Sequence, residues 1–138
     1  MKAVLALVVL GLFVISGIGV IAVTQDTSVI VTADLTLKPT PDPLTFGSLT
    51  PGSTSSPQEV TLTPGNSSLS VSVNITGASL LQSIQADFGS GYADLNGKGG
   101  ILITNNVPLL YNATLAIPPG TKQNTYNGQI VYTVNEAP

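Results

Sequence analysis

The sequence predicts an α+β protein in which a long apolar N-terminal α-helix precedes an antiparallel immunoglobulin-like β-sandwich. Residues 3–23 contain no charged residue, Asn, Gln or Pro. After residue 25, apolar residues recur at every second position in several short stretches, which is the period of a half-buried strand. Pro- and Gly-rich turns separate these stretches, as in all-β sandwiches. We therefore expect a hydrophobic helix over residues 1–25 and a sandwich domain over residues 26–138.

The apolar run at residues 3–23 is long enough to cross a membrane as a helix, since about 20 apolar residues span the hydrocarbon core of a bilayer. Three roles stay open for it: a signal that is removed, a membrane anchor, or the element that joins subunits in a filament. Lys2 and the site at Val20-Ile21-Ala22 fit a signal peptide, but the run exceeds the usual length of about 7 to 15 residues.

A retained helix would be apolar on every face, so each face should be buried in lipid or against other apolar side chains. Its small residues scatter around the helix, and no seam for close backbone packing is visible. The bulky side chains are the candidates for helix–helix packing in a filament core. We single out Leu5, Leu12 and Phe13.

The strands of the sandwich are predicted from period-two alternation between turn signals. Residues 29–37 begin the domain as a half-buried strand, and three prolines follow it. Residues 80–88 fit either helical spacing or one turn followed by a strand. Residues 89–100 read as a glycine-rich loop. The further predicted strands are residues 44–49, 59–63, 68–76, 101–103, 109–117 and 126–134.

The composition excludes several classes of function. Four Lys and Arg against seven Asp and Glu give a net charge of −3, so no basic surface is available for nucleic acid. Charged residues make up 8% of the chain against about 25% in a typical soluble domain. The surface must therefore consist largely of hydroxyl and amide side chains, which favours an exposed, extracellular location. Cys and His are absent, which excludes disulfides, thiolate nucleophiles and histidine chemistry.

No motif in the chain predicts an enzyme, and we expect no catalytic residue, no cofactor and no metal. Residues 91–98 miss the spacing and the hydroxyl of a phosphate-binding loop. The stretch Asp94-Leu95-Asn96-Gly97, with Asp87 nearby, has the beginning of a calcium loop but lacks its later ligands. A plain hairpin loop is the simpler interpretation.

Three Asn-x-Ser/Thr sequons predict N-glycosylation, and chance alone would give about two from this composition. Their positions are more informative than their number, because the alternation places each asparagine on the solvent side of a strand or in a turn. The candidate sites are Asn66, Asn74 and Asn112.

The combination of an apolar N-terminal helix and a small, charge-poor, Thr/Ser-rich β domain resembles archaeal type IV pilins and, more distantly, archaellins. This resemblance implies the structural subunit of an extracellular, cell-surface pilus. Identical helices would bundle in the filament core, β domains bearing glycans would coat the outside, and the helix would hold each subunit in the membrane before assembly. Leu5 stands where bacterial pilins have Glu, which favours the archaeal type.

Two alternatives stay open. The stretch from residue 44 to residue 77 and the ending LAIPPGTKQNTYNGQIVYTV are also similar to filament proteins of the TasA/camelysin type. That similarity implies that the apolar segment is removed as a signal, and that the strand around residues 29–37 completes a neighbour's sheet. A solitary surface protein anchored in the membrane is the third possibility.

Overall fold

The structure, a computed structural model, describes residues 22–138. The chain divides into two units, Met1–Thr32 and Ala33–Pro138. In the first unit, residues 22–32 belong to no helix or strand, and their side chains are exposed. The second unit contains every strand that the structure describes.

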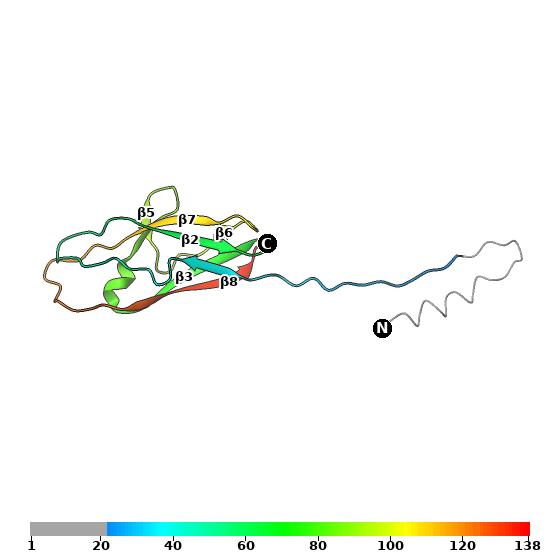
Figure 1. The fold of residues 1–138 in the computed structure, drawn as a ribbon, viewed down its shortest axis with the longest axis horizontal. Coiled ribbons are helices and arrows are strands. Elements are labelled where there is room, and N and C mark those ends of the chain that lie inside the picture. Colours follow the sequence, from blue (N-terminus) through cyan, green and yellow to red (C-terminus); the bar gives the residue numbers. More distant parts are fainter. Residues whose placement is uncertain (1–21) are drawn as a thin grey trace, which may run out of the picture. The chain divides into compact units, whose positions relative to one another are not determined.

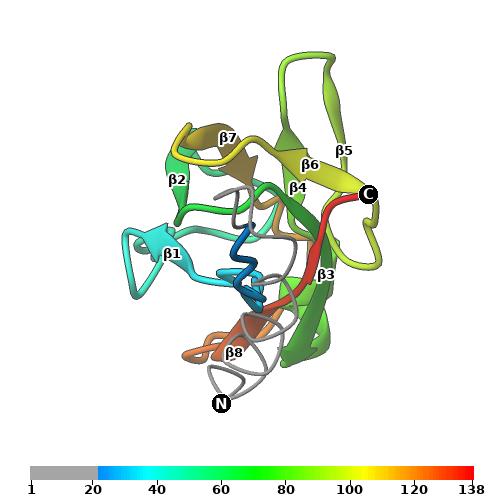
Figure 2. The same cartoon turned by 90° about the vertical axis from the view of Figure 1, so that its right-hand side faces the viewer.

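Two antiparallel sheets form the second unit (Figure 1). The five-stranded sheet has the order β1 (Leu37–Thr40), β2 (Gln58–Pro64), β7 (Leu109–Thr114), β4 (Gln85–Asp87) and β5 (Tyr92–Asp94). The three-stranded sheet has the order β6 (Ile101–Ile103), β3 (Leu69–Gly77) and β8 (Gly128–Glu136). The end-on view of Figure 2 shows β1, β2 and β7 on one side of the unit, and β3 and β8 on the other.

The core lies between the two sheets and is built by the predicted alternation. On β3, every second residue from Leu69 to Ile75 is buried, and the residues between them are intermediate or exposed. Val60 and Leu62 of β2 and Tyr111 of β7 face them from the other sheet. Each fully buried large apolar side chain contributes about 1.5–3 kcal/mol through removal from water. The predicted strands at residues 59–63, 68–76, 101–103, 109–117 and 126–134 correspond to β2, β3, β6, β7 and β8.

The α+β fold class is wrong for the described residues, which form a nearly all-β protein. No helix of seven or more residues occurs between residues 22 and 138, and the helical segment there is the 3-10 helix η2 (Ser79–Ser83). Residues 22–25, the described part of the expected helix, are not helical. Val23 and Thr24 are β-branched and form helices poorly. The rest of the expected helix, including Leu5, Leu12 and Phe13, lies outside the described residues.

Two predicted strands did not form as expected. Residues 29–36 show the right alternation but no partner strand lies beside them, and the first strand begins only at Leu37. Residues 44–49 are not a strand, because Gly47 adopts φ +74°, which is outside the β region. The ambiguous residues 80–88 contain the end of η2 followed by β4, and the glycine-rich loop contains the short strand β5.

Between residues 22 and 138, no helix has the length and the apolar composition needed to cross a lipid bilayer.

Candidate functional site

The outer edge of β8 is the longest unpaired strand edge that the structure describes. β8 has nine residues and pairs with β3 alone. Ala78 N donates to Asn127 O at 3.0 Å and Ala137 N donates to Ser68 O at 2.9 Å. Antiparallel pairs alternate between hydrogen-bonded and non-hydrogen-bonded, so the backbone groups of Ile130, Tyr132 and Val134 point away from β3. The edge therefore offers a row of free N–H and C=O groups.

The edge of β8 also lacks the features that normally protect an edge strand. Natural sheets shield their edges with Lys, Pro, inward-pointing charges or short strands. The edge strand β1 of the other sheet contains Lys38 and Pro39 and has four residues. β8 reads GQIVYTVNE and carries no charge before Glu136. One sheet edge is thus shielded, and the neighbouring long one is open to pairing.

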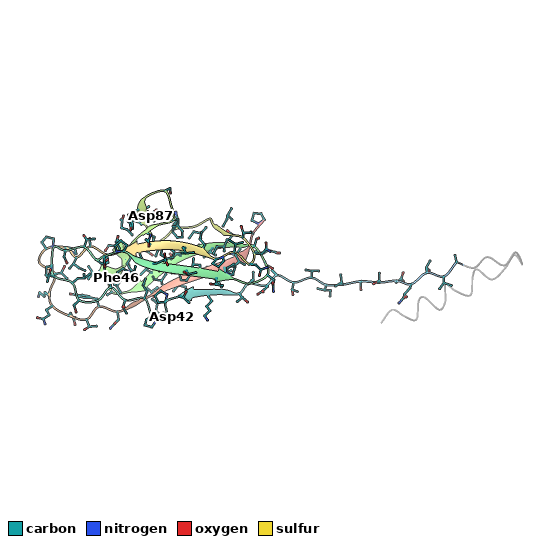
Figure 3. The ribbon with its side chains drawn as sticks, turned by 45° about the horizontal axis from the view of Figure 1, so that its top comes forward. Asp42, Phe46 and Asp87 are labelled. Atoms are coloured by element: carbon teal, nitrogen blue, oxygen red, sulfur yellow. The ribbon has the colours of Figure 1, made fainter. Side chains whose placement is uncertain are left out.

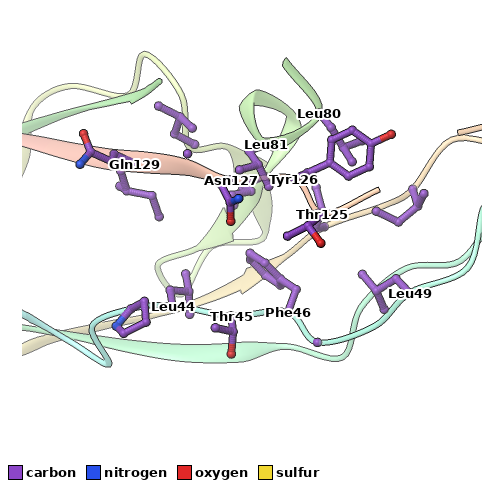
Figure 4. A pocket seen from close by; sticks show the side chains of 18 of the residues that line it. Leu44, Thr45, Phe46, Leu49, Leu80, Leu81, Thr125, Tyr126, Asn127 and Gln129 are labelled. Atoms are coloured by element: carbon purple, nitrogen blue, oxygen red, sulfur yellow. The ribbon is translucent and has the colours of Figure 1, made fainter. Parts of the chain in front are cut away.

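A groove of about 1330 Å³ opens beside the first half of β8, and its lining mixes apolar side chains with polar ones that include Asp42 and Lys122. One wall is residues 41–51, which follow β1, and the other is η2 together with the start of β8. Leu44, Phe46 and Leu49 extend from the first wall, and Leu80 and Leu81 stand on the second (Figure 4). Figure 3 shows Phe46 within the whole domain. All five side chains are only partly buried against the core. The groove is larger than the range of about 300–1,000 Å³ typical of small-molecule sites.

The inward side chains of β8 are incompletely covered, and two of them, Ile130 and Tyr132, line this groove. Ile130, Tyr132 and Val134 alternate along β8 and pack against the core, but none of them is fully buried. Their partners on β3, which are Ile75, Val73 and Val71, are almost completely buried. The sandwich therefore covers β3 and leaves apolar surface of β8 accessible from the groove.

A pair of tyrosines connects the two sheets beside the groove. The hydroxyl oxygens of Tyr111 and Tyr132 lie 2.6 Å apart, and either can donate the hydrogen bond. Burial raises the pKa of Tyr111 well above its ordinary value, and the neighbouring Tyr132 raises it further. Burial likewise raises the pKa of Tyr132. Both phenols are therefore neutral at ordinary pH, and the hydrogen bond between them joins the two sheets.

The opposite end of the sandwich holds the chain as it enters the domain. Asp34 N donates to Ser67 Oγ at 2.9 Å. The Asp34 carboxylate accepts bonds from Asn66 N at 2.9 Å, and from Thr36 N at 3.1 Å and Thr36 Oγ1 at 2.5 Å. A side chain at Gly65 would collide with this carboxylate. We call Asp34, Thr36 and residues 65–67 the anchor, because they fix the point at which residues 22–32 leave the domain.

The segment that leaves the anchor exposes apolar side chains. Val29, Ile30 and Val31 are 82%, 89% and 86% exposed. Isolated apolar residues on a surface need no explanation, but consecutive apolar residues in an unpaired, extended stretch do.

The structure places the three sequon asparagines separately on the surface. Asn66 lies in the anchor, Asn74 is on the outward face of β3 and Asn112 is on the outward face of β7. All three side chains are exposed. Asn112 is flanked across the sheet by Glu59 and Asp87.

The oxygens of the possible calcium loop already serve the fold. Asn96 Oδ1 accepts from Ile75 N at 2.8 Å, and Asp94 Oδ1 accepts from Gln85 Nε2 at 2.7 Å. Asp87 Oδ1 accepts from the backbone of Gly89 and Gly91. Among residues 22–138, no three acidic side chains gather in a group that could hold a metal ion. These oxygens therefore bind the loop's own backbone at Gly89 and Gly91, the neighbouring strand β3 at Ile75, and the side chain of Gln85 on β4.

Sequence reasoning did not identify the groove or the free edge of β8. The alternation in residues 126–134 predicts a strand but does not say whether one neighbour or two will flank it. One signal was present: this stretch contains neither Lys nor Pro, while residues 37–43 contain both.

No protein-family model matches this chain, and no curated protein or solved structure matches it.

Proposed function

We propose that this protein is the repeating structural subunit of an extracellular filament. The observation that carries the proposal is the polarity of the domain. The sandwich domain is entered at the anchor around Asp34, whereas its groove lies beside the start of β8, near the other end of the domain. Two different surfaces that join head to tail form an open chain unless the rotation between copies closes a ring.

The surface chemistry supports an extracellular location. Only 8% of the residues are charged, so the surface consists largely of hydroxyl and amide groups. The interactions of such a surface change little with salt concentration, because salt screens charges. The three exposed sequon asparagines can carry glycans where the producing organism has the machinery. Glycans at Asn74 and Asn112 would project from the outward faces of the two sheets, away from the groove.

The resemblance to archaeal pilins remains a reason to expect a cell-surface filament, in an archaeon above all. The helical core that the resemblance implies is not part of the proposal, since the open edge offers an assembly route through described residues alone. This route is closer to the strand-completing filaments than to the pilins. It is independent of whether residues 1–21 are removed or hold the subunit in the membrane before assembly.

Electron microscopy of the protein recovered from the surface of producing cells tests the proposal, together with mass spectrometry of its N-terminal peptide. We expect filaments with one domain per repeat. A start near residues 23–25 would show that the apolar segment is removed, and a start at Met1 or beside it would show that it is kept. Protein that is recovered only as single copies would contradict the proposal and favour a solitary anchored surface protein.

A further inference from the structure

We propose that Asn127 is a site of spontaneous deamidation, at which the folded protein slowly acquires Asp or isoaspartate at the start of β8. The chain contains two Asn-Gly pairs, Asn96-Gly97 and Asn127-Gly128. Glycine has no side chain to hinder its own backbone nitrogen, so the amide of a preceding asparagine is especially open to attack by that nitrogen. The structure holds the first pair closed to this reaction and leaves the second open. This site goes beyond the proposed function and does not depend on it, because the reaction needs only the folded domain.

The reaction uses the chain and water alone. The Gly128 nitrogen attacks Cγ of Asn127, and the new N–Cγ bond replaces the Cγ–Nδ2 bond. The displaced amide nitrogen takes up the Gly128 proton and leaves as ammonia, and a cyclic imide remains. Water then opens the imide: addition at Cγ gives Asp, and addition at the former backbone carbonyl carbon gives isoaspartate. No electron is transferred, so neither step needs an oxidant or a reductant.

The pair Asn96-Gly97 is held closed by β3. Gly97 N, which would be the nucleophile, donates to Val73 O at 2.8 Å. Asn96 Oδ1 accepts from Ile75 N at 2.8 Å, and this bond fixes the amide carbon that would be attacked. Both hydrogen bonds must break before the nitrogen can reach the amide. Breaking one such bond slows a reaction roughly fivefold, and breaking both slows it roughly thirtyfold.

The pair Asn127-Gly128 stands at the open end of β8. Both residues are exposed, whereas Asn96 is only partly so, and both line the groove (Figure 4). Ala78 N donates to Asn127 O at 3.0 Å, so the next pair, Gly77 with Gly128, is of the kind whose N–H groups point away from the partner strand. The nitrogen that attacks Asn127 therefore lies on the open side of β8, where water reaches it.

The fold itself requires the glycine that makes Asn127 reactive. A Cβ at position 128 would collide with Thr76 O and would lie 2.9 Å from Leu81 Cδ1. A Cβ at Gly77, the cross-strand partner, would lie 2.5 Å from Gly128 Cα. The close approach of β3 and β8 thus fixes glycine at this position, and the reactivity of Asn127 follows from the way the two strands pack.

The two products change the start of β8 differently. Either one adds a carboxylate at the groove, whose lining already includes Asp42 and Lys122. Isoaspartate also lengthens the backbone before Gly128 by one carbon, because the chain then runs through Cβ and Cγ of residue 127. This extra carbon displaces the carbonyl that accepts from Ala78 N. We therefore expect isoaspartate, more than Asp, to weaken the first pairing of β8 with β3.

Incubation of the full chain at mildly alkaline pH, followed by peptide mass mapping, tests the proposal. Deamidation replaces an amide by a carboxyl group, and the peptide mass rises accordingly. In the folded chain we expect Asn127 to convert more than about tenfold faster than Asn96. In the same chain unfolded in concentrated urea, the two rates should become similar, because neither pair is then held. Similar rates in the folded chain, or faster conversion at Asn96, would overturn the proposal.

Variants at position 127 provide the controls, since Gly128 cannot be changed without a collision. Asn127→Gln keeps an exposed amide but would have to close a larger ring, so the mass change at this position should disappear while position 96 is unaffected. Labelling by an isoaspartyl methyltransferase should mark residue 127 in the incubated chain and not in the Asn127→Gln chain. Asn127→Asp supplies one product directly, and its melting temperature should exceed that of the isoaspartate form. If Asn127 stays unmodified in the folded chain over a time in which the unfolded chain converts it, the fold protects this pair too and the proposal is wrong.

Discussion

Strands β3 and β8 are neighbours of equal length with the same alternation of residues, yet their surroundings differ. The inward residues of β3 are at most 4% exposed, whereas those of β8 are only partly buried. β3 lies between β6 and β8 and beneath the other sheet, while β8 has one neighbour and faces the groove. Alternation therefore determines which face of a strand is apolar, and the neighbouring elements determine whether that face is covered.

The largest effect that tests this comparison is a matched pair of truncations. Val71 of β3 and Val134 of β8 are cross-strand partners, and Val71 is 1% exposed. We expect Val71→Ala to lower the free energy of unfolding by about 2 kcal/mol, because it removes buried methyl groups and leaves a cavity. Val134→Ala should cost less than half of that. Urea denaturation of each variant beside the unmodified chain measures both values.

Equal losses from the two truncations would contradict the comparison, since β8 would then be as well covered as β3.

The hydrogen-bonded tyrosine pair joins the buried side of β7 to the partly buried side of β8, and the pH dependence of stability tests this connection. Burial raises the pKa of both Tyr111 and Tyr132, so the folded state keeps phenolic protons that the unfolded chain loses above about pH 10. The stabilisation is therefore complete below that pH and is lost as the pH rises further. Denaturation series at pH 8 to 11 should show falling stability in the unmodified chain.

The control for the tyrosine prediction is the double variant Tyr111→Phe with Tyr132→Phe. It removes both phenols and keeps most of the apolar contact, so the alkaline loss of stability should become shallower. An unchanged slope would show that the pair is not held neutral by the fold.

A smaller effect on stability is expected at the anchor, where Asp34 takes no part in the pairing of β3 with β8. The Thr36 hydroxyl, with the backbone of Asn66 and Thr36, lowers the pKa of the Asp34 carboxyl by hydrogen bonding. Because the pKa is lowered in the folded state, the ionised carboxylate stabilises the fold at pH values above the ordinary carboxyl pKa. This stabilisation is lost as the pH falls below about 4. Asp34→Asn should make the acid limb of the stability curve slightly flatter. An acid limb identical to that of the unmodified chain would contradict the role of the carboxylate.

The smallest expected effects are those of the sequons. Asn74→Gln and Asn112→Gln change exposed side chains on outward faces, so the free energy of unfolding should stay within about 0.5 kcal/mol. In protein from its own organism, each substitution at an occupied site should lower the intact mass by one glycan. A mass equal to the bare 14.1 kDa chain would show that no site is used.

The part of the fold that could be predicted from the sequence is the part that depends on local pattern. Residues 68–76 alternate Ser or Asn with Leu, Val or Ile, and they form β3 with the expected face buried. The solvent side of Asn66, Asn74 and Asn112 also followed from alternation and turn chemistry. The α+β class was wrong because the described residues form two antiparallel sheets with no helix of seven or more residues, and residues 22–25, the described end of the expected helix, are not helical.

The candidate site could not be predicted because it depends on residues far apart in the chain. Phe46, Leu81 and Ile130 line one groove, although nothing local connects residues 41–51, η2 and β8. The strand predicted at residues 29–37 shows the same limit, since its residues have the right period but find no partner before Leu37.

By itself, the sequence determined the segments that form β2, β3, β6, β7 and β8, the inward faces of β2, β3 and β7, and the charge-poor surface. These follow from side-chain chemistry at a period of two, which every residue carries regardless of its neighbours in space. Only the tertiary structure decided which strands lie at the edges, where Asp34 is held, and which apolar side chains remain half-covered. Those features arise from pairing between segments distant in the chain, because a backbone edge is satisfied or left open only when the sheet is assembled.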